Sequence, residues 1–178
     1  PTEWTNNSGE VPICYNYGRV RIVDETIPRV TIKAPNVEGC KDSILCVDIR
    51  VDSFTNMTGM QFSLQWNPAV LQYVSTGMYD LEGLTAGAFT NTNDKLRVSW
   101  ISPNGLPVTK ANNHKIFQLC FRLIGACDAT SPLNFVDVIE FIGTGPSALP
   151  HQTVAGSVRV KCDCAPNPPV CTLGTITN

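Results

Sequence analysis

The chain has 178 residues, a formal net charge of −2 at neutral pH and only 16% charged residues. Its length suits one ordinary domain with attached tails. A charge load this low and this balanced argues against a nucleic-acid partner or an anionic membrane surface. No apolar run approaches the ~20 residues that span a bilayer as a helix.

Short β-rich runs separated by turn residues follow one another along the chain, and thirteen glycines and thirteen prolines interrupt any long helical period. Many short strands at this spacing are typical of a sandwich or a barrel. A single helical turn is expected within 80–88 or 108–115. The predicted strands are 19–23, 29–34, 45–51, 60–66, 70–75, 96–101, 116–124, 133–141 and 154–160.

The segment 59–75 shows the strongest strand pattern, because apolar and polar residues alternate in it up to Trp66. Such alternation predicts one dry and one wet face. Asn67-Pro68 ends the strand, since proline cannot donate to a ladder and asparagine favours a turn. The predicted core comprises Phe62, Leu64, Trp66, Val47, Ile49, Val51, Leu96, Val98, Trp100, Phe117, Leu119, Phe121 and Leu123.

Composition divides the chain into a central sandwich, 29–161, an N-terminal extension, 1–28, and a cysteine- and proline-rich tail or linker, 162–178. The segment 18–22, GRVRI, resembles 156–160, GSVRV, at an offset of 138 residues. We interpret the extension as the terminal strand of a preceding module, which suits a repeat protein. Chance likeness of two amphipathic strands is the alternative.

Eight cysteines accompany only two histidines. A Cys/His zinc site therefore has few ligands, and Cys162-Asp163-Cys164 is not a C-x-x-C motif. The cysteines favour structural disulfides, an oxidising compartment and hence secretion.

Two cysteine pairs have nearly equal position sums, 166 for Cys46 with Cys120 and 167 for Cys40 with Cys127. Paired residues in an antiparallel ladder have a constant sum. We therefore predict Cys46–Cys120 and Cys40–Cys127 bonds across two neighbouring strands, with Cys46 and Cys120 facing outwards. The alternative is a pair of local loops, Cys40–Cys46 and Cys120–Cys127. The cysteines that stay unassigned are Cys14, Cys162, Cys164 and Cys171.

The order of elements from Arg29 to Val160 resembles a bacterial cohesin module. The resemblance rests on VTI at 30–32, VDIRV at 47–51, GMQFSLQWNP at 59–68, LRVSW at 96–100, IFQLCF at 116–121 and GSVRV at 156–160. It implies an all-β, nine-stranded jelly-roll β-sandwich, disulfide-stabilised here, in which the strands 45–51 and 116–124 are neighbours. Trp66-Asn67 replaces the usual Tyr-Asp, and the cysteines are unlike those of cellulosomal cohesins.

Catalysis is not indicated. The sequence contains no G-x-S-x-G, H-E-x-x-H, P-loop or dinucleotide motif. His114, in a polar stretch before a strand, is interpreted as solvated. The carboxylate pairs Asp80/Glu82 and Asp137/Glu140 could in principle serve glycoside hydrolysis, but surface positions are favoured.

No metal or cofactor is expected, with calcium as the single weak alternative. Asn91-Thr92-Asn93-Asp94 is rich in oxygen, yet calcium takes six to eight oxygen ligands and an ordinary turn is favoured. Asn6-Asn7-Ser8 and Asn56-Met57-Thr58 fit the N-glycosylation pattern.

Two function classes remain, neither of them enzymatic. The first is a structural or adhesive module of a secreted, bacterial cell-surface protein, a repeat or subunit of an adhesin or filament that self-associates end to end. The second, implied by the resemblance, is a recognition module that binds a dockerin or, less well supported, a carbohydrate. The candidate binding face comprises Gln61, Ser63, Gln65, Arg97, Ser99 and Ile101.

Overall fold

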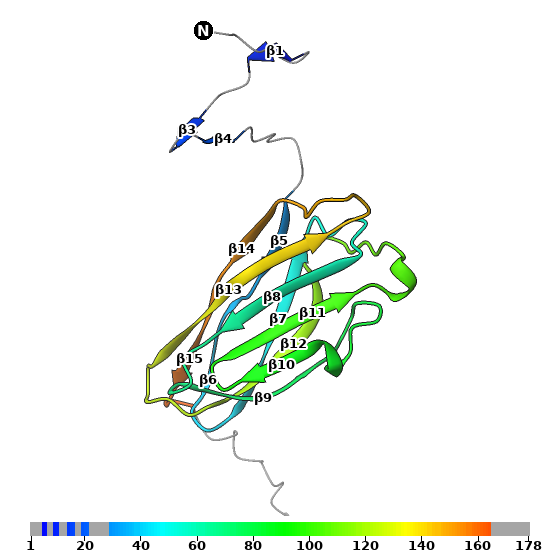
Figure 1. The fold of residues 1–178 in the computed structure, drawn as a ribbon. Helices are drawn as coiled ribbons and strands as arrows, with labels where there is room; N and C mark the ends of the chain where they lie inside the picture. The colour runs from blue at the N-terminus through cyan, green and yellow to red at the C-terminus, as the bar shows by residue number, and fades with distance from the viewer. Residues whose placement is uncertain (1–4, 7–8, 11–13, 17–18, 22–28, 165–178) are drawn as a thin grey trace, which may run out of the picture.

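A computed structural model describes residues 29–164 and the short segments 5–6, 9–10, 14–16 and 19–21. Residues 29–164 form a sandwich of two packed sheets, seen obliquely in Figure 1. The six-stranded sheet has the order β10 (Phe89–Thr92), β11 (Lys95–Ile101), β8 (Gly59–Gln65), β13 (Thr130–Ile142), β15 (Gly156–Lys161) and β6 (Asn36–Cys40). The five-stranded sheet has the order β14 (His151–Val154), β5 (Val30–Lys33), β7 (Ile44–Asp52), β12 (His114–Leu123) and β9 (Leu71–Gly77).

The remaining described elements are short. Two 3-10 turns, η1 (Ala86–Ala88) and η2 (Pro103–Gly105), lie in loops. Ahead of the sandwich, β1 (Thr5–Asn6) pairs with β2 (Gly9–Glu10), and β3 (Cys14–Asn16) pairs with β4 (Arg19–Arg21). No described helix is long and apolar enough to cross a membrane.

The all-β sandwich is confirmed, but the two sheets hold eleven strands instead of the nine expected. The strand expected at 154–160 is two strands, β14 and β15, and β6 and β10 have no counterpart among the expected strands. Both missed strands lie at sheet edges and carry few apolar side chains, so their sequences resemble loops. The helical turn forms at η1, within 80–88, whereas the segment 108–115 runs into β12.

The core contains every side chain expected there, each at most 3% exposed. Trp66 packs its ring edge-on against Phe121 at a centroid distance of 5.0 Å and stacks on Tyr73. Phe54 and Phe141 extend the core through an edge-to-face contact at 6.4 Å. Burial of each large side chain contributes about 1.5–3 kcal/mol, so the interior of the sandwich is sufficient to hold both sheets together.

Two extended runs cross from one sheet to the other side by side. The chain leaves β5 at Ala34-Pro35 and enters β6, and it leaves β14 at Ala155 and enters β15. β14 pairs with β5 in parallel, and β15 pairs with β6 in parallel, with the same offset of 121 positions in both ladders. Gly156 lies at the crossing, where an added Cβ would come within 2.2 Å of the Pro35 carbonyl oxygen.

The disulfides match the sequence prediction at one pair and correct it at the other. Cys46 and Cys120 are direct partners in the β7–β12 ladder and form a bond. The predicted Cys40–Cys127 bond is wrong, because Cys40 bonds to Cys164 and Cys127 bonds to Cys162.

The error has a topological cause. The β7–β12 ladder ends where Ile44 meets Arg122, so the constant sum does not extend to Cys40. Cys40 lies in β6 of the other sheet and is paired with Lys161, which brings the following C-x-C within reach. The local alternatives, Cys40–Cys46 and Cys120–Cys127, are also excluded by these bonds. Two other cysteines were unassigned. Cys14 lies in β3, but the structure does not describe its side chain, and Cys171 lies outside the described residues.

Candidate functional site

The six residues of the candidate face lie on two adjacent strands of the six-stranded sheet. β8 and β11 pair antiparallel, with Ser63 opposite Arg97 and Gln61 opposite Ser99. Phe62 and Val98, which also face each other in this ladder, point into the core. The structure therefore brings all six residues to one outer surface, which is what the alternation predicts. Their binding role remains a prediction.

Accessibility differs strongly among the six. Ile101 is 78% exposed, whereas Ser63 is buried at 1% exposure and cannot itself contact a partner protein. Gln65 is half-buried and donates a hydrogen bond to the Asp94 carboxylate at 3.1 Å. Gln61, Arg97 and Ser99 are exposed. The accessible part of the face thus belongs mainly to β11 and the centre of β8.

β13 supplies a further part of this surface that the sequence reasoning missed. It pairs with the other edge of β8, and its register jumps so that Val136 faces Ser63 while Glu140 faces Gln61. Two extra residues therefore bulge out of β13. Asp137 has a φ of 62° in this bulge. Bulges of this kind redirect side chains, and Val138 becomes 65% exposed.

The bulge is held by charged and polar contacts. Lys95 belongs to β11, which lies on the opposite side of β8 from β13, and it forms an ion pair with Asp137 at 3.1 Å. The Gln61 amide donates to the Glu140 carboxylate. Between these contacts lies a shallow depression of about 250 Å³ lined by Gln61, Phe62, Ser63, Arg97, Asp137 and Val138.

An apolar row closes one end of the face. Gly59 of β8 has Ile101 of β11 on one side and Ile142 of β13 on the other. Ile142 is 43% exposed. Since Gly59 has no side chain, the two isoleucines flank a low point in the surface. The sequence signal for Ile142 was present, because it continues the strand pattern past Phe141, but the expected strand ended one residue short.

The pKa of the Asp137 carboxyl is held below its usual value of 3.8 by hydrogen bonding to the Ser63 hydroxyl, and secondarily by Lys95. We expect carbon-detected NMR titration to give a pKa below 3.8, and Ser63→Ala to raise that pKa more than Lys95→Gln does. Because the folded-state pKa is depressed, this group stabilises the fold above pH 3.8, and that contribution is lost as the pH falls through the folded pKa. An Asp137 pKa unchanged by either substitution would contradict the assigned contacts.

The other carboxylates considered for catalysis are in surface contacts. Glu82 accepts a hydrogen bond from Lys110 at 3.2 Å, and an Asp80 carboxylate oxygen lies 3.2 Å from His114 Nε2. His114 is the first residue of β12 rather than part of the loop before it, and its side chain stays partly exposed. Asp137 and Glu140 belong to the β13 bulge described above.

Asn91–Asp94, the weak calcium candidate, forms the β10–β11 hairpin, in which Thr92 Oγ1 donates to the Lys95 carbonyl. Among the residues described, no group of three or more His, Cys, Asp or Glu could hold a metal ion. Asn56 of the second glycosylation motif is exposed, and the Thr58 hydroxyl donates to the Gly143 carbonyl at 2.9 Å. The first motif, 6–8, lies largely outside the described residues.

The disulfide-bonded β-sandwich and its mixed apolar and charged sheet face are those of a module for protein–protein recognition. The family model of the cohesin domain matches residues 30–160. The chain therefore belongs to the cohesin family. No curated protein matches the chain.

Solved cohesin structures share the fold at low sequence identity. The sixth cohesin of Acetivibrio cellulolyticus scaffoldin B, solved in complex with a dockerin, matches with a TM-score of 0.65 and 14% identity over 75% of this chain and 100% of that one. The seventh ScaB type I cohesin of Pseudobacteroides cellulosolvens has the same TM-score and sequence identity, over 79% of this chain and 96% of that one. A non-cellulosomal cohesin from the archaeon Archaeoglobus fulgidus matches with a TM-score of 0.58 and 17% identity, over 75% of this chain and 91% of that one.

Proposed function

We propose that the module binds a protein partner through the outer surface of β8, β11 and β13. The observation that carries this proposal is the combination of the Ile101–Gly59–Ile142 row with the bulge that exposes Val138 beside Arg97. Apolar anchors next to an arginine are typical of the centre of an interface. The partner should present apolar side chains together with acidic groups or carbonyls.

A dockerin-type protein is the partner class best supported. The cohesin family match and the solved complexes of similar cohesins with dockerins support it. Three disulfides in the described part of the chain favour an oxidising, extracellular location at the bacterial cell surface. A carbohydrate is a weaker candidate, because the face carries isoleucines and charges rather than a row of aromatic platforms.

The experiment is a binding titration of the full chain against a panel of dockerin modules. Arg97→Glu and Ile101→Asp should each weaken the tightest complex at least about 30-fold, the loss expected when an interface hot spot worth 2 kcal/mol is removed. Arg122→Glu makes the same charge reversal, and Val74→Asp a comparable apolar-to-acidic change, at exposed positions of the other sheet, and both serve as controls. Equal loss in both sets, or no dockerin binding at all, would contradict the proposal.

End-to-end assembly of an adhesin or filament is the second candidate function. Its specific support is the GRVRI likeness, since the described part of that segment, β4, is a strand as expected for an echo of β15. The boundaries at 28 and 161 and the repeat itself stay predictions. Light scattering of the full chain should show mass increasing with concentration, and a strict monomer would count against assembly.

A further inference from the structure

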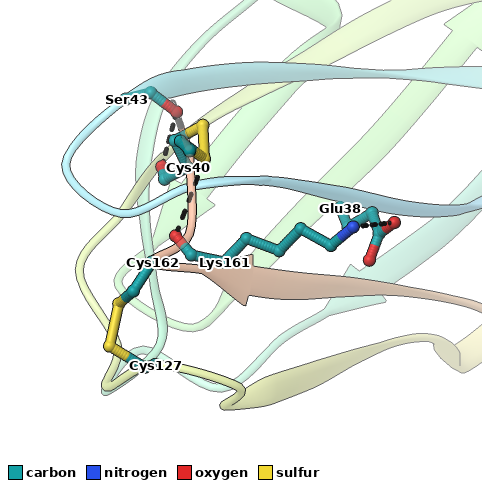
Figure 2. The surroundings of a disulfide bond; sticks show 7 residues. Glu38, Cys40, Ser43, Cys127, Lys161 and Cys162 are labelled. Atoms are coloured by element: carbon teal, nitrogen blue, oxygen red, sulfur yellow. Dashed lines mark hydrogen bonds and ion pairs between the residues drawn. A yellow bond between two sulfur atoms is a disulfide. The ribbon is translucent and has the colours of Figure 1, made fainter. Parts of the chain in front are cut away.

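The three described disulfides close one covalent ring at a single end of the sandwich. Cys40 and Cys46 flank the β6–β7 turn, Cys120 and Cys127 flank the end of β12, and the C-x-C follows β15. The bonds Cys46–Cys120, Cys127–Cys162 and Cys40–Cys164 link these three pieces in a circle. Figure 2 shows two of the bonds beside the end of β15.

Non-covalent contacts fasten the same end. Lys161 of β15 forms an ion pair with Glu38 of β6. The Ser43 hydroxyl donates to the Cys40 carbonyl at 2.6 Å, and the Asp128 amide donates to the Val160 carbonyl at 2.8 Å. The Lys41 amide also donates to the Lys161 carbonyl at 2.8 Å, so the last strand is bound to both loops around it.

The run from Arg29 to Cys40 is extended and crosses the whole sandwich. It comprises β5 and β6, which Figure 1 shows at opposite ends of the domain, with β15 ending beside β6. The roughly eleven steps from the first to the last of these residues, at about 3.3 Å each, span about 36 Å. Their maximal length, at about 3.6 Å per step, is only about 3 Å greater.

From this connectivity we propose a mechanical function: the run 29–40 and the Cys40–Cys164 bond form an inextensible link that carries tension between the two ends of the domain. The shortest covalent path from Arg29 to Cys164 follows the run and crosses the bond, because that bond joins residues 124 positions apart. Residues 41–163 therefore lie outside the path and bear no end-to-end load.

The candidate binding face lies within the unloaded part. β8, β11 and β13 belong to the loop that the Cys40–Cys164 bond closes. Tension on the chain is transmitted along β5 and β6 without extending those strands. The face would thus keep its shape while the chain is pulled, which is the requirement for a surface-attached module that holds its partner under flow.

Single-molecule force spectroscopy on the full chain tests the link. Cys14→Ser and Cys171→Ser are present in every variant so that only the three described bonds remain. In this oxidised background, we expect the end-to-end length of residues 29–164 to increase by at most about 1 nm on stretching, given the residue lengths above. After reduction the same segment should lengthen by about 45 nm, at about 3.6 Å for each released residue.

Single-bond variants separate the load path from general stabilisation. Adding Cys40→Ser with Cys164→Ser diverts the path through the other two bonds and should lengthen the segment by about 6 nm. The matched control, Cys46→Ser with Cys120→Ser, also removes one bond but leaves the link intact, so its length should stay within about 1 nm of the background.

The fully extended length depends on covalent connectivity alone, so it is measurable even in a variant that folds poorly. Equal lengthening of the two variants, or a gain of tens of nanometres in the oxidised background, would overturn the proposal.

Discussion

Gly156→Ala should destabilise the sandwich by about 3 kcal/mol, the upper end of the usual cost of inserting a methyl group where no space exists. The new Cβ would lie 2.2 Å from the Pro35 carbonyl oxygen and 2.6 Å from that of Ala34. Both atoms belong to the backbone, so no side-chain rotation relieves the contact. Pro35 lies where β5 continues into β6, and Gly156 where β14 continues into β15, so separating them would disturb both parallel ladders.

Urea unfolding of the oxidised protein measures this cost, with Gly77→Ala as the control. Gly77 also lies in a strand, β9, and an added Cβ there meets no atom within 4 Å. The control should therefore change the free energy of unfolding by less than about 1 kcal/mol, because only the backbone propensity differs. A small effect at both positions would mean that the two crossings can separate without breaking the ladders.

Removal of any one of the three disulfides should cost about 3 kcal/mol, although the bonded cysteines lie 124, 74 and 35 residues apart. The reason is the covalent ring. With two bonds intact, the third closes one short loop that is the same for all three bonds. This loop consists of six residues from Cys40 to Cys46, seven from Cys120 to Cys127 and two from Cys162 to Cys164. A loop of about 15 residues corresponds to about 3 kcal/mol in the chain-entropy account.

Guanidinium unfolding of three double Cys→Ser variants distinguishes this expectation from independent loops. Independent bonds would give costs that fall from about 5 to about 4 kcal/mol in the order of their sequence separations. Nearly equal costs support the ring, and a ranking by separation contradicts it. The wild-type chain, unfolded before and after reduction, gives the scale for all three bonds together.

The bulge of β13 shows where sequence reasoning stops. The alternation of 59–66 predicted both the strand and its wet face, because side chains alternate with period two whatever the strand is paired with. The strand that pairs with the other edge of 59–65, β13, was not predictable in the same way. Asp137 and Glu140 read as a pair of carboxylates, and nothing local indicates that two extra residues between Val136 and Glu140 lift Val138 into the surface.

By itself the sequence determined the all-β class, the buried side chains and the Cys46–Cys120 register, because these follow from local periodicity and from the constant sum within one ladder. Apart from that β7–β12 pair, only the tertiary structure decided which strands are neighbours within each sheet. Cys40 meets Cys164 because β6, an edge strand poor in apolar residues, lies parallel to β15, which is far away in the sequence, at an offset of 121 positions. That adjacency depends on which distant strands pair within the six-stranded sheet, and no local pattern records it.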